Sequence, residues 1–132
     1  MKEILKEIGI SEKTINQMED IFPNIKELNK EDVLKKIEIL KDLNCSDIQI
    51  RNIISSNAMY LDRSNTDIYK LIQTLKELGF DCLDLLFDGN PNILNLDEFE
   101  IKRYINKRIE NGELLEDIID DMSSNLYIFE EV

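Results

Sequence analysis

The phrase LKEIG at residues 5–9 returns as LKDLN at residues 40–44 and as LKELG at residues 75–79. The interval is 35 residues both times. Each phrase ends in glycine or asparagine, the residues that most readily adopt the left-handed conformation just beyond a helix C-terminus. We therefore expect each phrase to be the last turn of a long helix together with its C-cap. Gly112 fits the same place once more.

A short amphipathic segment follows each of these phrases. Its apolar residues recur at i, i+3 and i+4 spacing, which is typical of one face of a helix of about three turns. The three segments cover residues 11–22, 46–57 and 81–90. Ser11 and Ser46 stand where a hydroxyl can accept a hydrogen bond from the orphan N–H groups of the first turn. We therefore predict three short helices, with Ser11 and Ser46 as N-caps.

A break separates each short helix from the long helix that follows it. Pro23 and Pro91 occupy equivalent places after the first and third short helices, and Ala58 takes that place after the second. Proline lacks an N–H group and disfavours helix at the preceding residue. The first and third short helices are therefore expected to end at proline, and the second to end through Asn57 and packing.

The long helices are predicted to begin after Asn29 and Ser64, each with an Asp three residues further on, and the third to cover residues 96–112. Apolar residues at helical spacing in all these helices are more often core than a ligand groove. That reasoning also places in the core Ile21, Phe99 and Ile109.

The recurring unit is therefore a short helix, a break, a long helix and a cap. At this length a single domain, residues 1–132, is expected. The units span about residues 5–39, 40–74 and 75–112, and an acidic terminal cap covers residues 113–132. Repeats of this length bury their apolar faces against their neighbours. We predict an all-α fold, a short helical-repeat solenoid with incomplete ends.

This unit resembles the repeat of the mitochondrial transcription termination factor (mTERF) family, in which a leucine-rich helix end with glycine precedes a short helix, a proline and the next long helix. The matching stretches are LKEIGISEKTINQMEDIFPNI, LKDLNCSDIQIRNIISSNAMYL and LKELGFDCLDLLFDGNPNIL. The resemblance implies a curved array with a concave side, which binds double-stranded nucleic acid through basic residues along a groove. In this chain acidic residues outnumber basic ones, so we carry over the fold and not the DNA-binding residues.

The net charge of −12 is concentrated at one end of the chain. Residues 1–108 hold 20 acidic and 16 basic side chains, a balance of −4, and residues 109–132 hold 8 acidic and no basic side chains, a balance of −8. A polyanion is repelled by such an end. The charge therefore disfavours nucleic acid as a partner.

One basic cluster stands against this trend, in the sequence IKRYINKR at residues 101–108. Lys102, Arg103, Lys107 and Arg108 could form a phosphate-binding face, since Lys and Arg supply the salt-dependent part of nucleic-acid binding. The simpler interpretation is that the cluster faces the acidic segment that follows it and complements the helix dipole.

That acidic segment holds five carboxylates, several of which share a helix face. They are Glu113, Glu116, Asp117, Asp120 and Asp121. A divalent cation site is one interpretation, although no glycine-turned loop or fixed ligand spacing accompanies it. A surface that docks onto a basic protein is a second. A solvated terminal cap is the third and the simplest.

Other chemistry finds little support in the sequence. Histidine is absent and no glycine-rich phosphate loop is present, so we expect no catalytic residues, no metal and no cofactor. No apolar run reaches the about 18 residues that a membrane span needs. Cys45 and Cys82 lack metal-ligand spacing and are expected to be buried thiols. A soluble cytoplasmic protein is the expected class.

These observations favour a non-catalytic interaction module that binds another protein through a concave repeat face or the acidic C-terminal cap. The alternative is a nucleic-acid-binding protein of the mTERF type, which would use the basic helix around residues 102–108.

Overall fold

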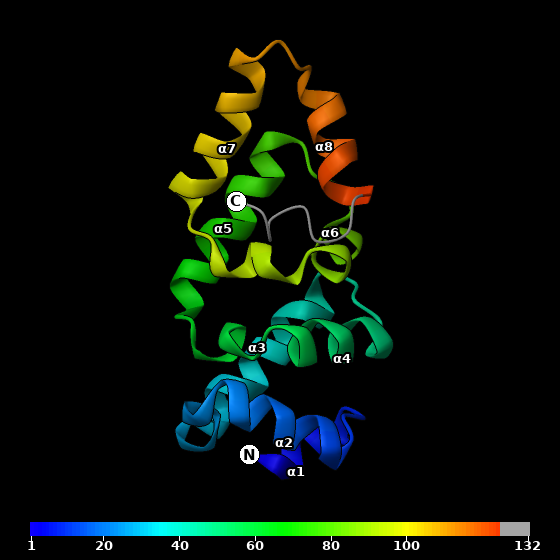
Figure 1. Ribbon diagram of the computed structural model, residues 1–132, viewed down its shortest axis with the longest axis vertical. Helices are drawn as coiled ribbons and strands as arrows, with labels where there is room; N and C mark the ends of the chain where they lie inside the picture. The colour runs from blue at the N-terminus through cyan, green and yellow to red at the C-terminus, as the bar shows by residue number, and fades with distance from the viewer. Residues whose placement is uncertain (125–132) are drawn as a thin grey trace. The chain divides into compact units, whose positions relative to one another are not determined.

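The computed structural model describes residues 1–124, which contain eight α-helices, three 3₁₀-helices and no strand (Figure 1). The prediction of an all-α fold is confirmed. Contacts divide the chain into two compact units, Met1–Asn65 and Thr66–Val132. Residues 125–132 of the predicted terminal cap lie outside the described residues, and the assignment of the whole chain to one domain stays a prediction.

The first unit contains four α-helices and two 3₁₀-helices, with one 3₁₀-helix after each pair of α-helices. They are α1 (Lys2–Glu7), α2 (Glu12–Ile21), η1 (Pro23–Glu27), α3 (Lys30–Asp42), α4 (Asp47–Ser56) and η2 (Ala58–Asp62). The second unit repeats this order from α5, whose first residue still belongs to the first unit. Its elements are α5 (Asn65–Leu78), α6 (Leu83–Gly89), η3 (Pro91–Asn95), α7 (Glu98–Glu110) and α8 (Leu115–Ser124).

The predicted N-caps of the first unit are confirmed. Ser11 Oγ accepts a hydrogen bond from the Thr14 N–H at 3.2 Å. Asn29 Oδ1 accepts one from the Glu31 N–H at 2.8 Å. Ser46 forms a full capping box with Gln49, because each side chain accepts from the backbone N–H of the other residue. These bonds satisfy helix donors that would otherwise have no partner.

Helices α1, α3, α5 and α7 all end in the same hydrogen-bonded turn. One residue in each turn has positive φ, with values of 96°, 68°, 107° and 94° at Gly9, Asn44, Gly79 and Gly112. The N–H of the following residue donates to the carbonyl five residues earlier, in the pairs Ile10–Leu5, Cys45–Leu40, Phe80–Leu75 and Glu113–Arg108. This pattern is the Schellman motif, and it confirms that the recurring phrase is a helix end with its C-cap.

The breaks between short and long helices are themselves ordered as 3₁₀-helices. Each follows a residue with non-helical backbone angles, with φ of −133°, −144° and −136° at Phe22, Asn57 and Asn90. Pro23 and Pro91 begin the first and third of these helices, and Ala58 begins the second with the same geometry. The side chains of Asn57 and Asn90 are buried, and Asn90 Nδ2 donates to the Met122 carbonyl at 2.8 Å.

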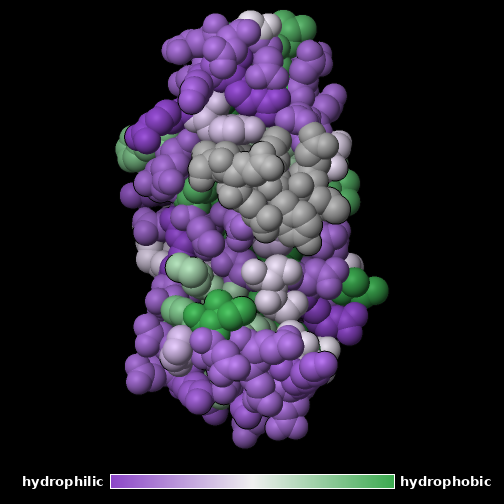
Figure 2. All heavy atoms as spheres, in the orientation of Figure 1, coloured by the Kyte–Doolittle hydropathy of each residue, from purple (hydrophilic) through white to green (hydrophobic). Residues whose placement is uncertain are grey.

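The leucine that opens the recurring phrase belongs to the core in all three copies. Leu5, Leu40 and Leu75 have no exposed surface. The surface in Figure 2 is largely hydrophilic, with only scattered hydrophobic residues. None of the helices within the described residues is long and apolar enough to cross a bilayer.

Some residues that we expected in the core are exposed. Ile21 is 83% exposed at the end of α2, and Phe99 is 65% exposed in the first turn of α7. Ile109 is exposed as well. These three predictions are wrong because each residue lies on a helix face that no other element of residues 1–124 covers. Cys82, the N-cap residue of α6, is also exposed, whereas Cys45, the residue after the positive-φ Asn44, is buried as expected.

Lys36 on α3 is buried, with 1% of its surface exposed. Its Nζ donates to Asn65 Oδ1 at 2.6 Å, and Tyr60 Oη donates to its backbone carbonyl at 2.7 Å. Burial lowers the pKa of Lys36, and the charges of Asp32 and Asp62 partly oppose that effect. The side chain thus ties α3 to the start of α5 within the first unit.

The positive-φ glycines give a matched test of the helix ends. Gly112→Ala places a Cβ in open space, so we expect only the backbone strain, a loss of about 1 kcal/mol in the free energy of unfolding. Gly9→Ala should cost more, because its Cβ would lie 2.7 Å from Cδ of Arg51. In an Arg51→Ala background the cost of Gly9→Ala should fall to that of Gly112→Ala. Urea denaturation measures all three; equal costs in the wild-type background would show that Arg51 moves freely.

Candidate functional site

The predicted basic cluster is divided between two faces of α7. Lys102, Arg103 and Lys107 are exposed. Arg108 faces the other way, and 18% of its side chain is exposed. The spacing explains the division, because residues three and four apart share a helix face. The four residues therefore do not form one basic patch.

Arg108 is held by three neighbouring side chains. Its Nε and Nη2 donate to the two carboxylate oxygens of Glu113 at 2.8 and 2.6 Å. Its Nη1 donates to Asp121 Oδ2 at 2.7 Å and to Tyr104 Oη at 2.9 Å. The guanidinium carbon lies 5.6 Å from the centre of the Tyr104 ring. The predicted pairing between the basic cluster and the acidic segment thus occurs, through Arg108.

These contacts fix the charge states of the cluster. The hydrogen bond to Glu113, followed by those to Asp121 and Tyr104, raises the pKa of Arg108, against the opposite effect of burial. The hydrogen bond from Arg108 in turn lowers the pKa of Glu113. Arg108 therefore remains a cation whose charge is already matched by two carboxylates, and it has little left to offer a ligand.

The repeat explains why an ion pair stands here. Arg108 lies four residues before Gly112, the place that Leu5, Leu40 and Leu75 occupy before the earlier caps. In the Schellman motif the residue four before the positive-φ residue and the residue directly after it commonly make an apolar contact. The earlier pairs are all buried: Leu5 with Ile10, Leu40 with Cys45 and Leu75 with Phe80. At the end of α7 the ion pair of Arg108 and Glu113 replaces that apolar pair.

The outward face of α7 contains a shallow hollow of about 690 Å³. Its lining residues follow each other at helical spacing: Phe99, Lys102, Arg103, Asn106, Lys107 and Glu110. None of its three cations forms a salt bridge with a described residue. Three positive charges and one negative charge therefore face solvent along a single helix face.

The predicted acidic surface is divided as well. Glu113 and Asp121 are bound by Arg108, whereas Glu116, Asp117 and Asp120 are exposed on α8. Within residues 1–124, no three acidic or thiol side chains gather closely enough to hold a metal ion. The exposed acids thus remain a surface without a metal-binding arrangement.

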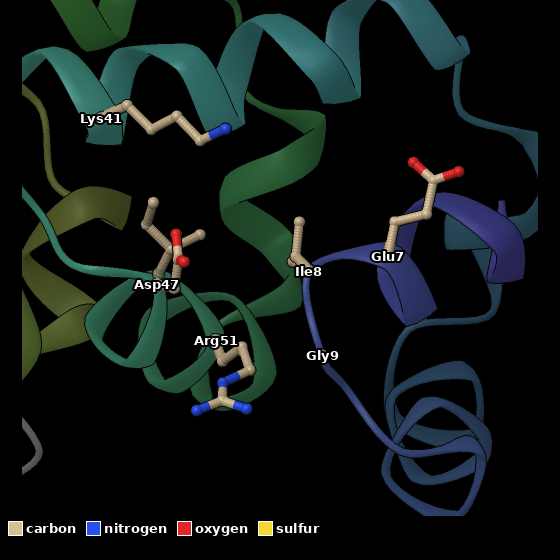
Figure 3. Close-up of a pocket in the computed structure, with 7 residues that line it drawn as sticks. Glu7, Ile8, Gly9, Lys41, Asp47 and Arg51 are labelled. Carbon is tan, nitrogen blue, oxygen red and sulfur yellow. The ribbon is translucent and has the colours of Figure 1, made fainter.

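A second hollow, of about 480 Å³, lies in the first unit and was not predicted from the sequence (Figure 3). Lys41 reaches it from α3, Asp47 and Arg51 belong to α4, and Glu7 lies at the end of α1. Its two acidic and two basic side chains balance, so it does not favour a polyanion. No sequence pattern predicts this hollow, because it depends on the close approach of Arg51 to Gly9 in the fold.

Comparison with known proteins places most of the chain in one family. A family model described as mTERF matches residues 2–106. No curated protein matches, and no solved structure matches. The matched region includes Lys102 and Arg103 but ends before Lys107, Arg108 and α8.

The Arg108–Glu113 pair makes stability depend on pH in a defined direction. The lowered pKa of Glu113 means that its carboxylate stabilises the folded state above the ordinary carboxyl pKa of about 4.3. This contribution is lost as the pH falls through the lowered pKa. We therefore expect Glu113→Gln to lower the urea midpoint at pH 7, and the difference from wild type to shrink below about pH 4.3.

Glu110→Gln is the matched control, since Glu110 is exposed and forms no salt bridge with a described residue. It should change the midpoint little at either pH. A loss in Glu113→Gln that is the same at pH 7 and pH 3 would contradict the pairing.

Proposed function

We propose, because the chain belongs to the mTERF family, that it binds nucleic acid and that the exposed cations of α7 contact the phosphates. The family match over residues 2–106 supports nucleic acid over a protein as the partner. Within the chain, the observation that carries the proposal is the outward face of α7, where Lys102, Arg103 and Lys107 form no salt bridge with a described residue. The activity is binding without catalysis.

The net charge of −12 is weaker evidence against this function than its size suggests. Exposed charges further apart than about 10 Å are largely screened at 0.1 M salt, so a ligand responds mainly to the local balance. Two of the acids near the end of α7, Glu113 and Asp121, are already matched by Arg108. The proposed contacts therefore exclude Arg108 and consist of Lys102, Arg103 and Lys107.

Two triple variants separate this surface from a general effect of charge. One carries Lys102→Gln, Arg103→Gln and Lys107→Gln. The control carries Lys2→Gln, Lys13→Gln and Lys30→Gln, which are exposed and form no salt bridge with a described residue. Each variant loses three positive charges, so both have a net charge of −12 − 3 = −15.

Binding to fluorescent DNA, single-stranded and duplex, is measured by anisotropy over a range of salt. The slope of log affinity against log salt reports phosphate contacts, at about 0.7 to 0.9 each. The α7 variant should lose about two to three units of slope and at least about tenfold in affinity at low salt. The control variant should keep the slope. Equal losses in both variants, or no binding by the wild type at low salt, would contradict the proposal.

A protein partner remains the second candidate, because Glu116, Asp117 and Asp120 are exposed together on α8. If these carboxylates dock onto a basic protein, neutralising them as Glu116→Gln, Asp117→Asn and Asp120→Asn should abolish capture of that protein from nuclease-treated lysate. Capture that persists unchanged in this variant would exclude the acidic surface as the binding site.

A further inference from the structure

Phe99 is a large aromatic residue that is exposed to solvent on α7. Its side chain stands on the first turn of the helix, and 65% of its surface is exposed. Ile101 and Ile105 supply the buried face of the same helix. Phe99 therefore contributes little to the core, although exposure of so large an apolar group is unfavourable unless something covers it.

The cations of α7 stand beside this ring. Lys102 and Arg103 are three and four residues from Phe99, so they are its nearest neighbours on the helix surface. Phe99, Lys102, Arg103 and Lys107 form a strip that extends over eight residue steps, about 12 Å at 1.5 Å per residue. The strip thus combines one exposed aromatic face with three positive charges over a length that suits a few nucleotides.

We propose that this strip binds an unpaired stretch of single-stranded nucleic acid, with one base stacked on Phe99 and the neighbouring phosphates held by Lys102, Arg103 and Lys107. The inference rests on the proposed function and narrows it. Sites for single strands combine a positive track along the backbone with aromatic rings on which bases stack. The strip has both of these parts on a single helix face.

A duplex would use this surface less well. In a duplex the faces of the bases are already stacked on one another, so only the cations could make contact and the ring would remain uncovered. The cations also argue against an apolar protein segment as the occupant, because it would leave three positive charges unmatched. Asn106, within the same hollow, can donate to or accept from the edge of a base.

The test uses three probes of about 12 nucleotides, a length within the usual site size for single-strand binding. They are a thymidine oligonucleotide, an abasic strand with the same phosphates, and a duplex. The proteins are the wild type, Phe99→Ala, Phe99→Leu and Phe99→Trp. Leu114→Ala is the matched control, since Leu114 is another exposed apolar residue of the second unit. Phe99 is exposed, so these variants should fold, which circular dichroism verifies.

The proposal expects the wild type to prefer the thymidine strand to the abasic strand and the duplex. Phe99→Ala and Phe99→Leu should both weaken thymidine binding about tenfold or more, because leucine keeps the apolar contact but lacks the ring. Phe99→Trp should keep the affinity, and Leu114→Ala should not change it. The natural chain has no tryptophan, so the indole of Phe99→Trp is the sole source of tryptophan fluorescence in that variant. Quenching of this fluorescence by the thymidine strand and not by the abasic strand reports stacking directly.

Two results would overturn the inference while leaving the proposed function in place. One is equal affinity of the wild type for the thymidine and abasic strands. The other is binding by Phe99→Ala within about twofold of the wild type. If the wild type binds none of the three probes at low salt, the proposed function fails together with the inference.

Discussion

The left-handed residue that closes each long helix is the constraint on which the fold depends. The N–H groups of this residue and of the next one donate hydrogen bonds to carbonyls of the helix's last turn. The chain thereby turns so that the next side chain points back at that turn. In the first three turns that residue is apolar and buried, as are the leucines that it pairs with. A helix end without this turn would leave its last carbonyls unsatisfied and would misdirect the short helix that follows.

The parts of the fold that are local in sequence were predictable. Glycine or asparagine after a leucine-rich turn, serine before an amphipathic run and proline after it each act on their immediate neighbours, so the helices and their caps follow from the residues alone. The ordering of the breaks as 3₁₀-helices was not predicted, because Pro23 and Pro91 signal only that the short helix ends, and Ala58, which begins the second 3₁₀-helix, carries no such signal. The burial of Lys36 was missed because its hydrogen-bond partner, Asn65, lies 29 residues away in the sequence.

The candidate site was only partly predictable, and the reason is the direction in which each side chain of α7 points. Phe99 was assigned to the core, yet it lies two residues before the buried Ile101, and residues two apart lie on opposite sides of a helix. The prediction of a single basic cluster likewise ignored the direction of each side chain around the helix. Four basic residues within seven positions must spread around the helix, and the structure shows which of them is paired and which face solvent.

The ion pair at the end of α7 also determines which face of that helix is presented. Arg108 lies nine residues after Phe99, about two and a half turns, so the two side chains point in opposite directions. An apolar contact tolerates some rotation of the helix, whereas the forked guanidinium bonds both oxygens of Glu113 and one of Asp121 and so favours a single orientation. With Arg108 held against α8, the strip from Phe99 to Lys107 must face outward. The residue that looked like part of the binding surface is therefore better understood as the one that orients it.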